Sequence, residues 1–351
     1  MSKRGRNQLS PWTLALGVAA VAFATKRFLQ SRFSFRERVV VITGGSRGLG
    51  LAMARAFAEE GAHLVLLARS KVELERAEVD LRDYGDGALM LIPCDIRYEE
   101  QVQAAIEIAV ERLGRIDVLV NNAGEIMVGP IHTMTREDWT DCMDLHFWAS
   151  LYTMQAALPH MQPGEGRIVN ITSFGGKIAV PHMAPYCASK FALVGLSDSV
   201  RAELAMEGIR VTTVCPGLMR TGSHLNAMFK GDYQKEFAWF SAGAGSPLNS
   251  KNAMRAAHQI VEACRRGQPE LTITIQARLA FIAQALFPNL FARAVAQVNS
   301  FLPRSTKTQE DLERHMGWES RSDLVPMPLT ALADDATEDL NGLRGHLTAQ
   351  R

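Results

Sequence analysis

A tyrosine and a lysine stand four residues apart in the segment APYCASKF, which covers residues 184–191. The surrounding sequence is typical of a helix, and side chains four apart lie one turn apart on the same helical face. This spacing would place the phenol of Tyr186 beside the ammonium group of Lys190. A free tyrosine has a pKa of about 10, and a neighbouring positive charge lowers that pKa. The pair could therefore exchange a proton near neutral pH, although an exposed ring beside a solvated lysine has the same spacing.

A glycine-rich turn in VVVITGGSRGLG (39–50) could hold a phosphate group. Gly44, Gly48 and Gly50 let the backbone approach a pyrophosphate, and the helix that follows offers free N–H groups and a positive dipole end. Tight turns also use glycine for purely steric reasons. The position of this turn between the first strand and the first helix nevertheless indicates a dinucleotide site.

Short apolar runs alternate with longer amphipathic runs along the chain, which predicts a doubly wound α/β Rossmann-type fold. Strands that alternate with helices form right-handed βαβ units, so the sheet is parallel and covered by helices on both faces. The predicted strands are 38–43, 63–68, 88–94, 116–120, 166–172, 209–215 and 271–275, and helices are expected at 49–60, 70–83, 98–113, 136–160 and 187–206.

The composition excludes several classes of function. The chain has 351 residues, with 38 lysine and arginine residues against 37 aspartate and glutamate residues, so its charge gives no support for nucleic-acid binding. The five cysteines are far apart and form no C-x-x-C pair, which argues for reduced thiols rather than disulfides or a zinc site. The histidines lack ligand-like spacing, so we expect no metal; those considered are His132, His182 and His224.

Five motifs occur in a specific order on these elements. The first reads T-G-x-x-x-G-x-G, NNAG (121–124) follows the fourth strand, and Ser173 follows the fifth. The Tyr186 and Lys190 pair comes next, and CPGLMRT (215–221) follows the sixth strand. Together they resemble the short-chain dehydrogenase/reductase family over about residues 38–275.

The resemblance implies a nicotinamide cofactor and a set of residues around it. Asp95 would bind the adenine amino group, although it could equally cap the helix that follows. Asn121 would support the sheet edge beside the cofactor. The cofactor-binding set implied by the resemblance is Thr43, Gly44, Ser46, Arg47, Gly48, Leu49, Gly50, Arg69, Asp95, Asn121, Ala123, Gly124, Tyr186, Lys190, Pro216, Gly217 and Thr221.

The end of the second strand favours NADP(H) over NAD(H). An acidic residue there would bind the ribose 2′-hydroxyl, but the sequence LLARSK ends in Arg69, with Lys71 nearby. Arg47 lies inside the glycine-rich turn. Two guanidinium groups that converge on this point would suit bidentate binding of a 2′-phosphate. The alternative is that Arg69 packs over the adenine.

The chemistry that the resemblance implies is hydride transfer between the cofactor and a carbonyl or alcohol. Tyr186 would be the general acid or base, Lys190 would favour its phenolate, and Ser173 would hydrogen-bond the substrate oxygen. One position departs from the family, where an asparagine commonly orients a water that links the lysine to solvent. His146 stands at that place. It could relay a proton, or it could be a packed helix residue.

The termini predict additional segments, so the chain divides into 1–37, 38–275, 276–303 and 304–351. Residues 9–25 carry no charge and are followed by a basic cluster, which indicates a membrane anchor with the catalytic domain facing the cytoplasm. One alternative is a cleaved signal peptide. The other is a soluble or peripheral N-terminal helix, in which case the enzyme would be cytoplasmic. Residues 276–303 are apolar and would pack on the domain, self-associate or lie on a membrane. From Arg304 onward we expect a loosely ordered tail.

The insertion at 229–250 predicts a lid or substrate-binding lobe. Phe174, Met183, Met219 and Trp239 flank the motifs and would line a substrate pocket, or else belong to the core. The apolar segments favour a lipophilic substrate. The alternatives to a dehydrogenase are a catalytically silent NADP(H)-binding scaffold or sensor, and a lyase or epimerase on the same fold. The resemblance also implies a homo-oligomer formed through helices at 136–160 and 185–206.

Overall fold

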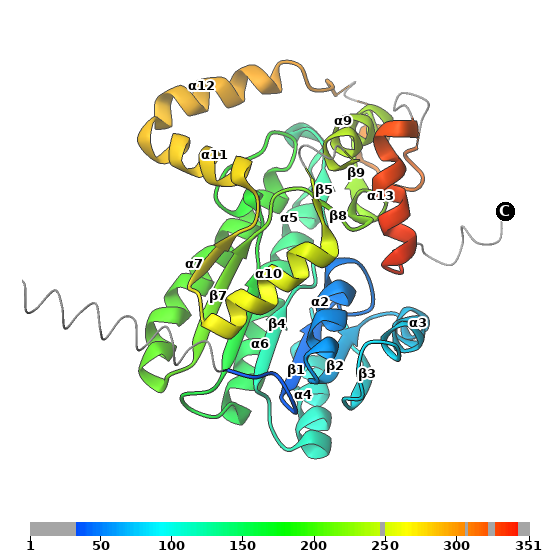
Figure 1. The fold of residues 1–351 in the computed structure, drawn as a ribbon. Coiled ribbons are helices and arrows are strands. Elements are labelled where there is room, and N and C mark those ends of the chain that lie inside the picture. Colours follow the sequence, from blue (N-terminus) through cyan, green and yellow to red (C-terminus); the bar gives the residue numbers. More distant parts are fainter. Residues whose placement is uncertain (1–32, 246–249, 306–307, 322–326, 343–351) are drawn as a thin grey trace, which may run out of the picture.

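The computed structural model describes residues 33–245, 250–305, 308–321 and 327–342, and it is built around one seven-stranded parallel sheet (Figure 1). The strand order is β11-β7-β6-β4-β1-β2-β3, so the sheet reverses its winding between β1 and β4. All seven predicted strands are present, with ends that differ by at most three residues. Their bounds are β1 Val39–Thr43, β2 His63–Ala68, β3 Leu89–Pro93, β4 Val118–Asn121, β6 Arg167–Ile171, β7 Arg210–Cys215 and β11 Glu270–Thr272.

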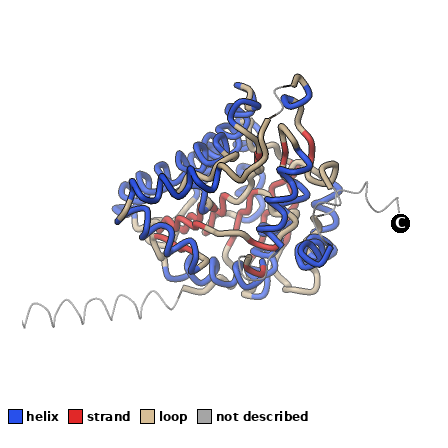
Figure 2. Tube along the Cα trace, turned by 90° about the horizontal axis from the view of Figure 1, so that it is seen from above, coloured by secondary structure: helices blue, strands red, loops and turns tan. Residues whose placement is uncertain are grey.

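Helices cover both faces of the sheet, and Figure 2 shows them on either side of the strands. Alternate residues of β1 explain this arrangement, because Val40 and Ile42 join one buried cluster while Val39 and Val41 join another. The first cluster lies under α2 (Gly48–Glu59), α3 (Lys71–Leu81) and α10 (Ala253–Arg266). The second lies under α4 (Glu99–Leu113), α6 (Ala149–Ala157) and α7 (Ala184–Leu204).

The predicted helix at 136–160 is interrupted. It consists of α5 (Arg136–Met143), the π-helical turn η2 (Asp144–Trp148), α6, and the short turn η3 (Leu158–His160). A π-helical turn adds a residue to the backbone spacing and is frequent at functional sites. The turn η2 carries His146, so it redirects this side chain within an otherwise regular helix. The remaining short turns are η1 Ile131–Thr133, η4 Phe174–Gly176, η5 Ala205–Glu207 and η6 Glu310–Leu312.

Two small sheets lie at the carboxyl edge of the main sheet and support the insertion. One has the order β12-β9-β5 and the other joins β10 to β8. The helix α9 (Tyr233–Gly245) follows β9 and lines the main cavity through Trp239, Phe240 and Gly243. The bounds of the short elements are β5 Met127–Val128, β8 Met219–Arg220, α8 Ser223–Asn226, β9 Met228–Phe229, β10 Lys251–Asn252 and β12 His315–Met316.

The described part of 304–351 is not a loose tail, which corrects the sequence prediction. The strand β12 pairs antiparallel with β9, and α13 (Met327–Asp339) packs beside α9 (Figure 1). Arg314 bonds to the fully buried Asp138 at 2.7 Å. The carboxylate of Asp339 lies 3.2 Å from Arg55 on α2. The polar residues of this segment form ion pairs with the domain, and a sequence pattern cannot distinguish such residues from solvated ones.

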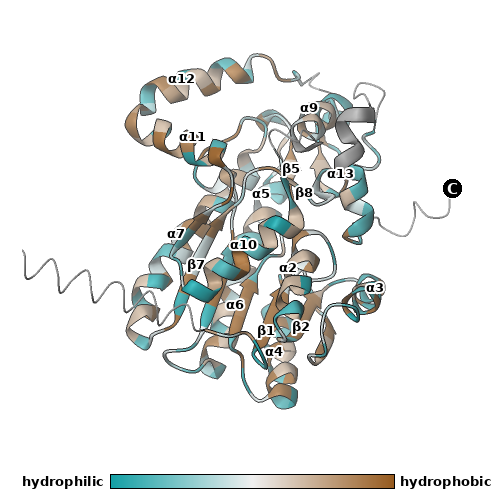
Figure 3. Cartoon of the chain, in the orientation of Figure 1, coloured by the Kyte–Doolittle hydropathy of each residue, from teal (hydrophilic) through white to brown (hydrophobic). Residues whose placement is uncertain are grey.

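The helices α11 (Ile275–Leu286) and α12 (Pro288–Asn299) form a hairpin that extends from the body of the domain (Figure 1). Figure 3 shows apolar residues on these helices as well as on the central strands. Leu286, Phe287 and Leu290 are each more than half exposed. Within the described residues, the helices are all too short or too polar to cross a bilayer. The predicted anchor at 9–25 lies outside the described residues.

Candidate active site

One cavity of about 1060 Å³ runs along the carboxyl edge of the sheet. It joins the glycine-rich loop to the Tyr186 segment, so the two ends of the predicted site share one space. Four predicted site residues do not line it: Thr43, Gly50, Asn121 and His146. The predicted site residues that do line it are Gly44, Ser46, Arg47, Gly48, Leu49, Arg69, Asp95, Ala123, Gly124, Ser173, Tyr186, Lys190, Pro216, Gly217 and Thr221.

The glycine-rich loop has a conformation that requires glycine. Gly44 and Gly48 have φ angles of +63° and +57°, in the left-handed region. A Cβ on Gly50 would lie 2.0 Å from the carbonyl oxygen of Gly44, so α2 can approach the loop this closely only with glycine. The result is a glycine-lined cradle at the start of α2, which fits the pyrophosphate of a dinucleotide.

Thr43 and Asn121 act behind the cavity wall. The Thr43 hydroxyl accepts hydrogen bonds from the backbone N–H groups of Asn122 and Ala123, at 2.9 and 3.1 Å. Asn121 donates to the side chain of Asn170 at 2.9 Å and accepts from Thr153 at 2.6 Å. Both residues are buried and join the carboxyl ends of neighbouring strands, so they fix the loops that line the cavity.

Ser173, Tyr186 and Lys190 lie together at the other end of the cavity. Ser173 follows β6; its hydroxyl accepts from the backbone N–H of Gly175 at 3.0 Å and lies near enough to the Tyr186 phenol to oppose the rise in its pKa. The Lys190 Nζ lies 5.9 Å from the centre of the Tyr186 ring and donates to the carbonyl oxygen of Ile171 at 3.0 Å. Tyr186 and Lys190 both belong to the first turns of α7, as their spacing predicts.

Burial is the largest influence on the pKa values of Tyr186 and Lys190. It raises the pKa of Tyr186 above the usual value for a phenol, while the hydrogen bond from Ser173 opposes this shift. Burial also lowers the pKa of Lys190 to about 8. The sequence predicts a lowered tyrosine pKa from the neighbouring ammonium. In the structure the pKa of Tyr186 is raised instead, because burial of the phenol is the largest effect.

His146 is buried and has both ring nitrogens in hydrogen bonds. Its Nε2 accepts from the backbone N–H of Glu125 at 3.2 Å, and its Nδ1 lies 2.8 Å from the hydroxyl of Ser189. Ser189 donates its own proton to the carbonyl oxygen of Tyr186, so Nδ1 is the donor of the pair. Burial, and then the charge of Lys190, hold the pKa of His146 well below its usual value. The ring is therefore neutral and connects two segments, which argues against the proton-relay interpretation.

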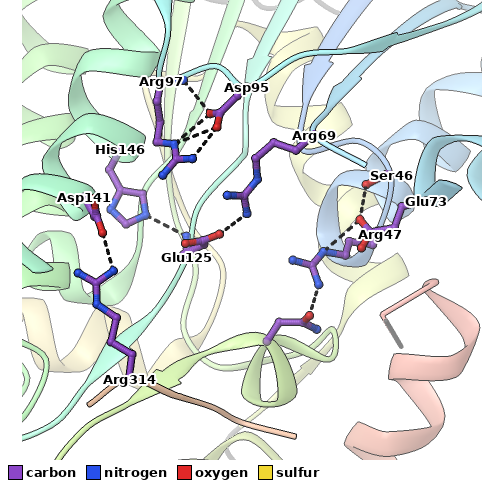
Figure 4. A network of polar contacts seen from close by, with 11 residues as sticks. Ser46, Arg47, Arg69, Glu73, Asp95, Arg97, Glu125, Asp141, His146 and Arg314 are labelled. Carbon is purple, nitrogen blue, oxygen red and sulfur yellow. Dashed lines mark hydrogen bonds and ion pairs between the residues drawn. The ribbon is translucent and has the colours of Figure 1, made fainter. Parts of the chain in front are cut away.

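The end of the cavity beside the glycine-rich loop holds several charged side chains (Figure 4). Arg69 pairs with Glu125, and Arg47 bonds to Asn226. The two guanidinium groups therefore have separate partners and do not converge, in contrast to the sequence prediction. Asp95 is bonded to Arg97 at 2.5 Å. Burial alone would raise the pKa of Asp95, but the Arg97 contact lowers it.

The C-terminal segment contacts the glycine-rich loop directly, and no sequence motif indicates this contact. The backbone N–H of Gly48 donates to the carbonyl oxygen of Leu340 at 2.9 Å. The Asn341 side chain donates to the carbonyl oxygens of Ser46 and Glu73, at 2.9 and 3.0 Å. We call residues 339–342 the C-terminal clasp. Asn226, which bonds to Arg47, also donates to the carbonyl oxygen of Gly342 in this clasp at 3.0 Å.

The substrate end of the cavity is largely apolar. Phe174, Met183, Met219 and Trp239 line it as predicted. The hairpin helix α11 adds Gln276, Ala277 and Ala280, which the sequence does not single out. Phe281 on the same helix stacks on Phe174, with ring centres 5.6 Å apart. Among the described residues, no group of three or more histidine, cysteine, aspartate or glutamate side chains is placed to hold a metal ion.

A family model described as short chain dehydrogenase matches residues 38–228. The chain belongs to the short-chain dehydrogenase family. It is therefore an oxidoreductase that acts on carbonyl or alcohol groups, and its fold binds a nicotinamide cofactor. The glycine cradle and the long cavity fit such a cofactor.

Similar proteins of this short-chain dehydrogenase family include reductases of different substrates. The chain is 34% identical to a dehydrogenase/reductase SDR family protein 7-like of Anopheles gambiae, over 72% of this chain and 80% of that protein. It is 38% identical to a putative ketoacyl reductase of Streptomyces coelicolor, over 53% of this chain and 72% of that one. The structure of L-sorbose reductase from Gluconobacter frateurii, complexed with NADPH and L-sorbose, matches with a TM-score of 0.62 and 26% identity, over 68% of this chain and 96% of that chain.

Proposed function

We propose that this protein is an NADPH-dependent oxidoreductase that acts on a carbonyl or alcohol group of a lipophilic substrate. The observation that carries the proposal is the convergence of Ser173, Tyr186 and Lys190 in the cavity that also holds the glycine-rich loop. A catalytically silent scaffold would have no need for a buried phenol that shares the cavity with a serine and a buried lysine.

A nicotinamide cofactor held in this cavity would supply or accept the hydride. Tyr186 protonates the carbonyl oxygen during reduction and removes the proton of the alcohol in the reverse direction. Its raised pKa keeps the phenol protonated at neutral pH, which is the form that reduction requires. Ser173 donates a hydrogen bond to the same oxygen and stabilises the charge that develops there. The ammonium of Lys190 stabilises the phenolate as the proton leaves.

The cofactor preference rests on Arg47 and Arg69. Both line the cavity and carry permanent positive charge, and an acidic side chain does not stand at the end of β2. On binding a 2′-phosphate, Arg69 would exchange its pair with Glu125 for the phosphate, since its side chain is nearly half exposed. The NADPH in the sorbose reductase structure is consistent with this choice.

A lipophilic substrate is supported by the apolar wall that Phe174, Trp239, Phe240 and Ala280 form. The helix α11, which contributes Ala280 to this wall, and the helix α12 also carry exposed apolar residues. Together with the uncharged segment at 9–25, they support attachment to a membrane with the catalytic domain on the cytoplasmic side. We also expect self-association through α6 and α7, since Trp148 beside α6 and Phe191 on α7 are exposed.

The test follows oxidation of NADPH and NADH by the full-length protein in detergent, with ketones and aldehydes graded from short to long chains. We expect turnover with NADPH that increases with chain length and is lost in Tyr186→Phe. The matched control is Tyr152→Phe, because Tyr152 stacks on Trp148 away from the cavity and should keep full activity. Binding of NADPH without turnover in either direction would overturn the proposal and favour the scaffold.

A further inference from the structure

A fully buried carboxylate lies inside the apolar cluster that forms the substrate end of the cavity. Glu236 on α9 has no exposed surface. The cluster around it contains the catalytic tyrosine as well as residues of the insertion. Its members are Val128, Met183, Tyr186, Cys187, Leu225, Ala227, Phe229, Phe237 and Phe240, with Trp239 packed at its edge.

The two oxygens of Glu236 accept hydrogen bonds from two different segments. The indole N–H of Trp239 donates to Oε2 at 2.6 Å. The Nδ1 of His182 lies 2.7 Å from Oε1 and donates to it, because a carboxylate can only accept. Trp239 lines the substrate cavity, and His182 stands just before α7, which carries Tyr186. Glu236 therefore connects a wall of the cavity to the segment that precedes the catalytic helix.

The backbone around His182 is also fixed in an unusual conformation. Its φ angle is +63°, which a residue with a side chain seldom adopts. The carbonyl oxygen of His182 accepts from the backbone N–H of Gly129 at 2.7 Å. A buried carboxylate costs several kcal/mol unless its hydrogen bonds are made, so the geometry is maintained only if both donors stay in place. The orientation of Trp239 is consequently determined by the segment that leads into α7.

We infer that Glu236 is a positioning residue, which holds Trp239 as a rigid wall of the substrate site through its bridge to His182. The inference rests on the proposed function and adds the residue that determines substrate selection there. A fixed indole makes the cavity discriminate between chain lengths, because each methylene contacts the same surface in every complex. A mobile indole would weaken the dependence of kcat/KM on the chain length of the substrate.

The experiment measures kcat and KM with NADPH and straight-chain ketones from butanone to dodecanone. Glu236→Leu replaces the carboxylate with an apolar side chain of similar size, so it removes both hydrogen-bond acceptors. Glu236→Gln is the conservative rescue, because its carbonyl accepts from Trp239 and its amide donates to the other neutral tautomer of His182. Trp239→Phe and the double variant complete a double-mutant cycle. Thermal unfolding with and without NADPH checks that each variant is folded.

We expect Glu236→Leu to lower kcat/KM for dodecanone by about fivefold or more, mainly through KM, and for butanone by about twofold at most. Glu236→Gln should restore the wild-type dependence on chain length. In the Trp239→Phe background the effect of Glu236→Leu should disappear. Equal losses for every ketone, or equal losses with and without Trp239, would overturn the inference.

A second readout separates failure of this inference from failure of the proposed function. If the wild-type protein turns over none of the ketones with NADPH and none of the corresponding alcohols with NADP⁺, the proposed function is wrong. The wall is then tested by titrating dodecanone into the NADP⁺-loaded protein and following tryptophan fluorescence. Quenching that is lost in Trp239→Phe and weakened about fivefold in Glu236→Leu would still support the wall. Quenching that is identical in all variants would overturn it.

Discussion

The C-terminal clasp gives a prediction whose magnitude follows from the hydrogen bonds of Asn341. Its side chain donates to the carbonyl oxygens of Ser46 and Glu73, at 2.9 and 3.0 Å. Each bond contributes about 0.5–1.5 kcal/mol, so replacing Asn341 with glycine should weaken the clasp by about 1–3 kcal/mol. Glycine adds no backbone strain at this position, where the φ angle is +54°. Asn341→Ala loses the same bonds and adds about 1 kcal/mol of left-handed strain.

The amide of Gly48 reports the state of the clasp. It is the first residue of α2, where N–H groups lack an intrahelical partner, and it donates instead to Leu340. Hydrogen exchange followed by mass spectrometry on a peptide that covers the glycine-rich loop therefore measures how often the clasp opens. A loss of about 1–3 kcal/mol corresponds to a decrease in protection of about 5- to 150-fold for Asn341→Gly. Asn341→Ala should lose about fivefold more.

The control is Asn299→Gly at the exposed end of α12, which should leave protection of Gly48 unchanged. Peptides from β6 should keep their protection in all variants, because the clasp does not contact that strand. Unchanged protection of Gly48 in Asn341→Gly would refute the reasoning. An equal loss of protection in β6 would refute it as well, since that result would indicate global destabilisation.

Three further predictions concern buried ionisable groups. The unfolded chain binds a proton at His146 below about pH 6.5, whereas the folded protein excludes it, so the free energy of unfolding should fall by up to about 1.4 kcal/mol per pH unit as the pH decreases. His146→Asn should remove this component in urea titrations between about pH 7 and 5, and an unchanged slope would contradict it. The Lys190 ammonium has a pKa of about 8, so kcat/KM should decrease as the pH rises through that value; a flat profile there would show that its charge is not needed. Lys230→Met removes one of the two cationic partners of the buried Asp138 and leaves Arg314, so it should lower the free energy of unfolding by about 1.5–3 kcal/mol, and a urea midpoint equal to that of the wild type would rule this out.

The central sheet could be predicted from the sequence because its strands are buried on both faces. Such strands appear as continuous apolar runs, and VVVIT at β1 is an example. The glycine-rich loop and the pair on α7 follow from local backbone geometry, so short motifs identify them. The apolar wall at Phe174 and Trp239 follows from their positions beside these motifs.

The contacts that the sequence does not predict are long-range and polar. Arg69 pairs with Glu125 and Arg47 with Asn226, and neither partner is indicated by a motif. The π-helical turn at His146 has no recognisable sequence pattern, because it depends on packing around the catalytic helix. Asn341 looks like any polar residue in a charged segment. Its role depends on backbone carbonyls that the fold brings to it from a distant part of the chain.

The position of the clasp in the chain has a consequence for biosynthesis. Asn341 and Ser46 are separated by 295 residues, so the glycine-rich loop emerges from the ribosome long before its partner. At about 5–20 residues per second, the delay is about 15–60 s. During that interval the sheet can assemble while the cofactor loop stays uncovered. A chain cut shortly before residue 339 would therefore contain every strand and motif of the domain. Its glycine-rich loop would nevertheless lack the contacts of the clasp, as it does in the nascent protein.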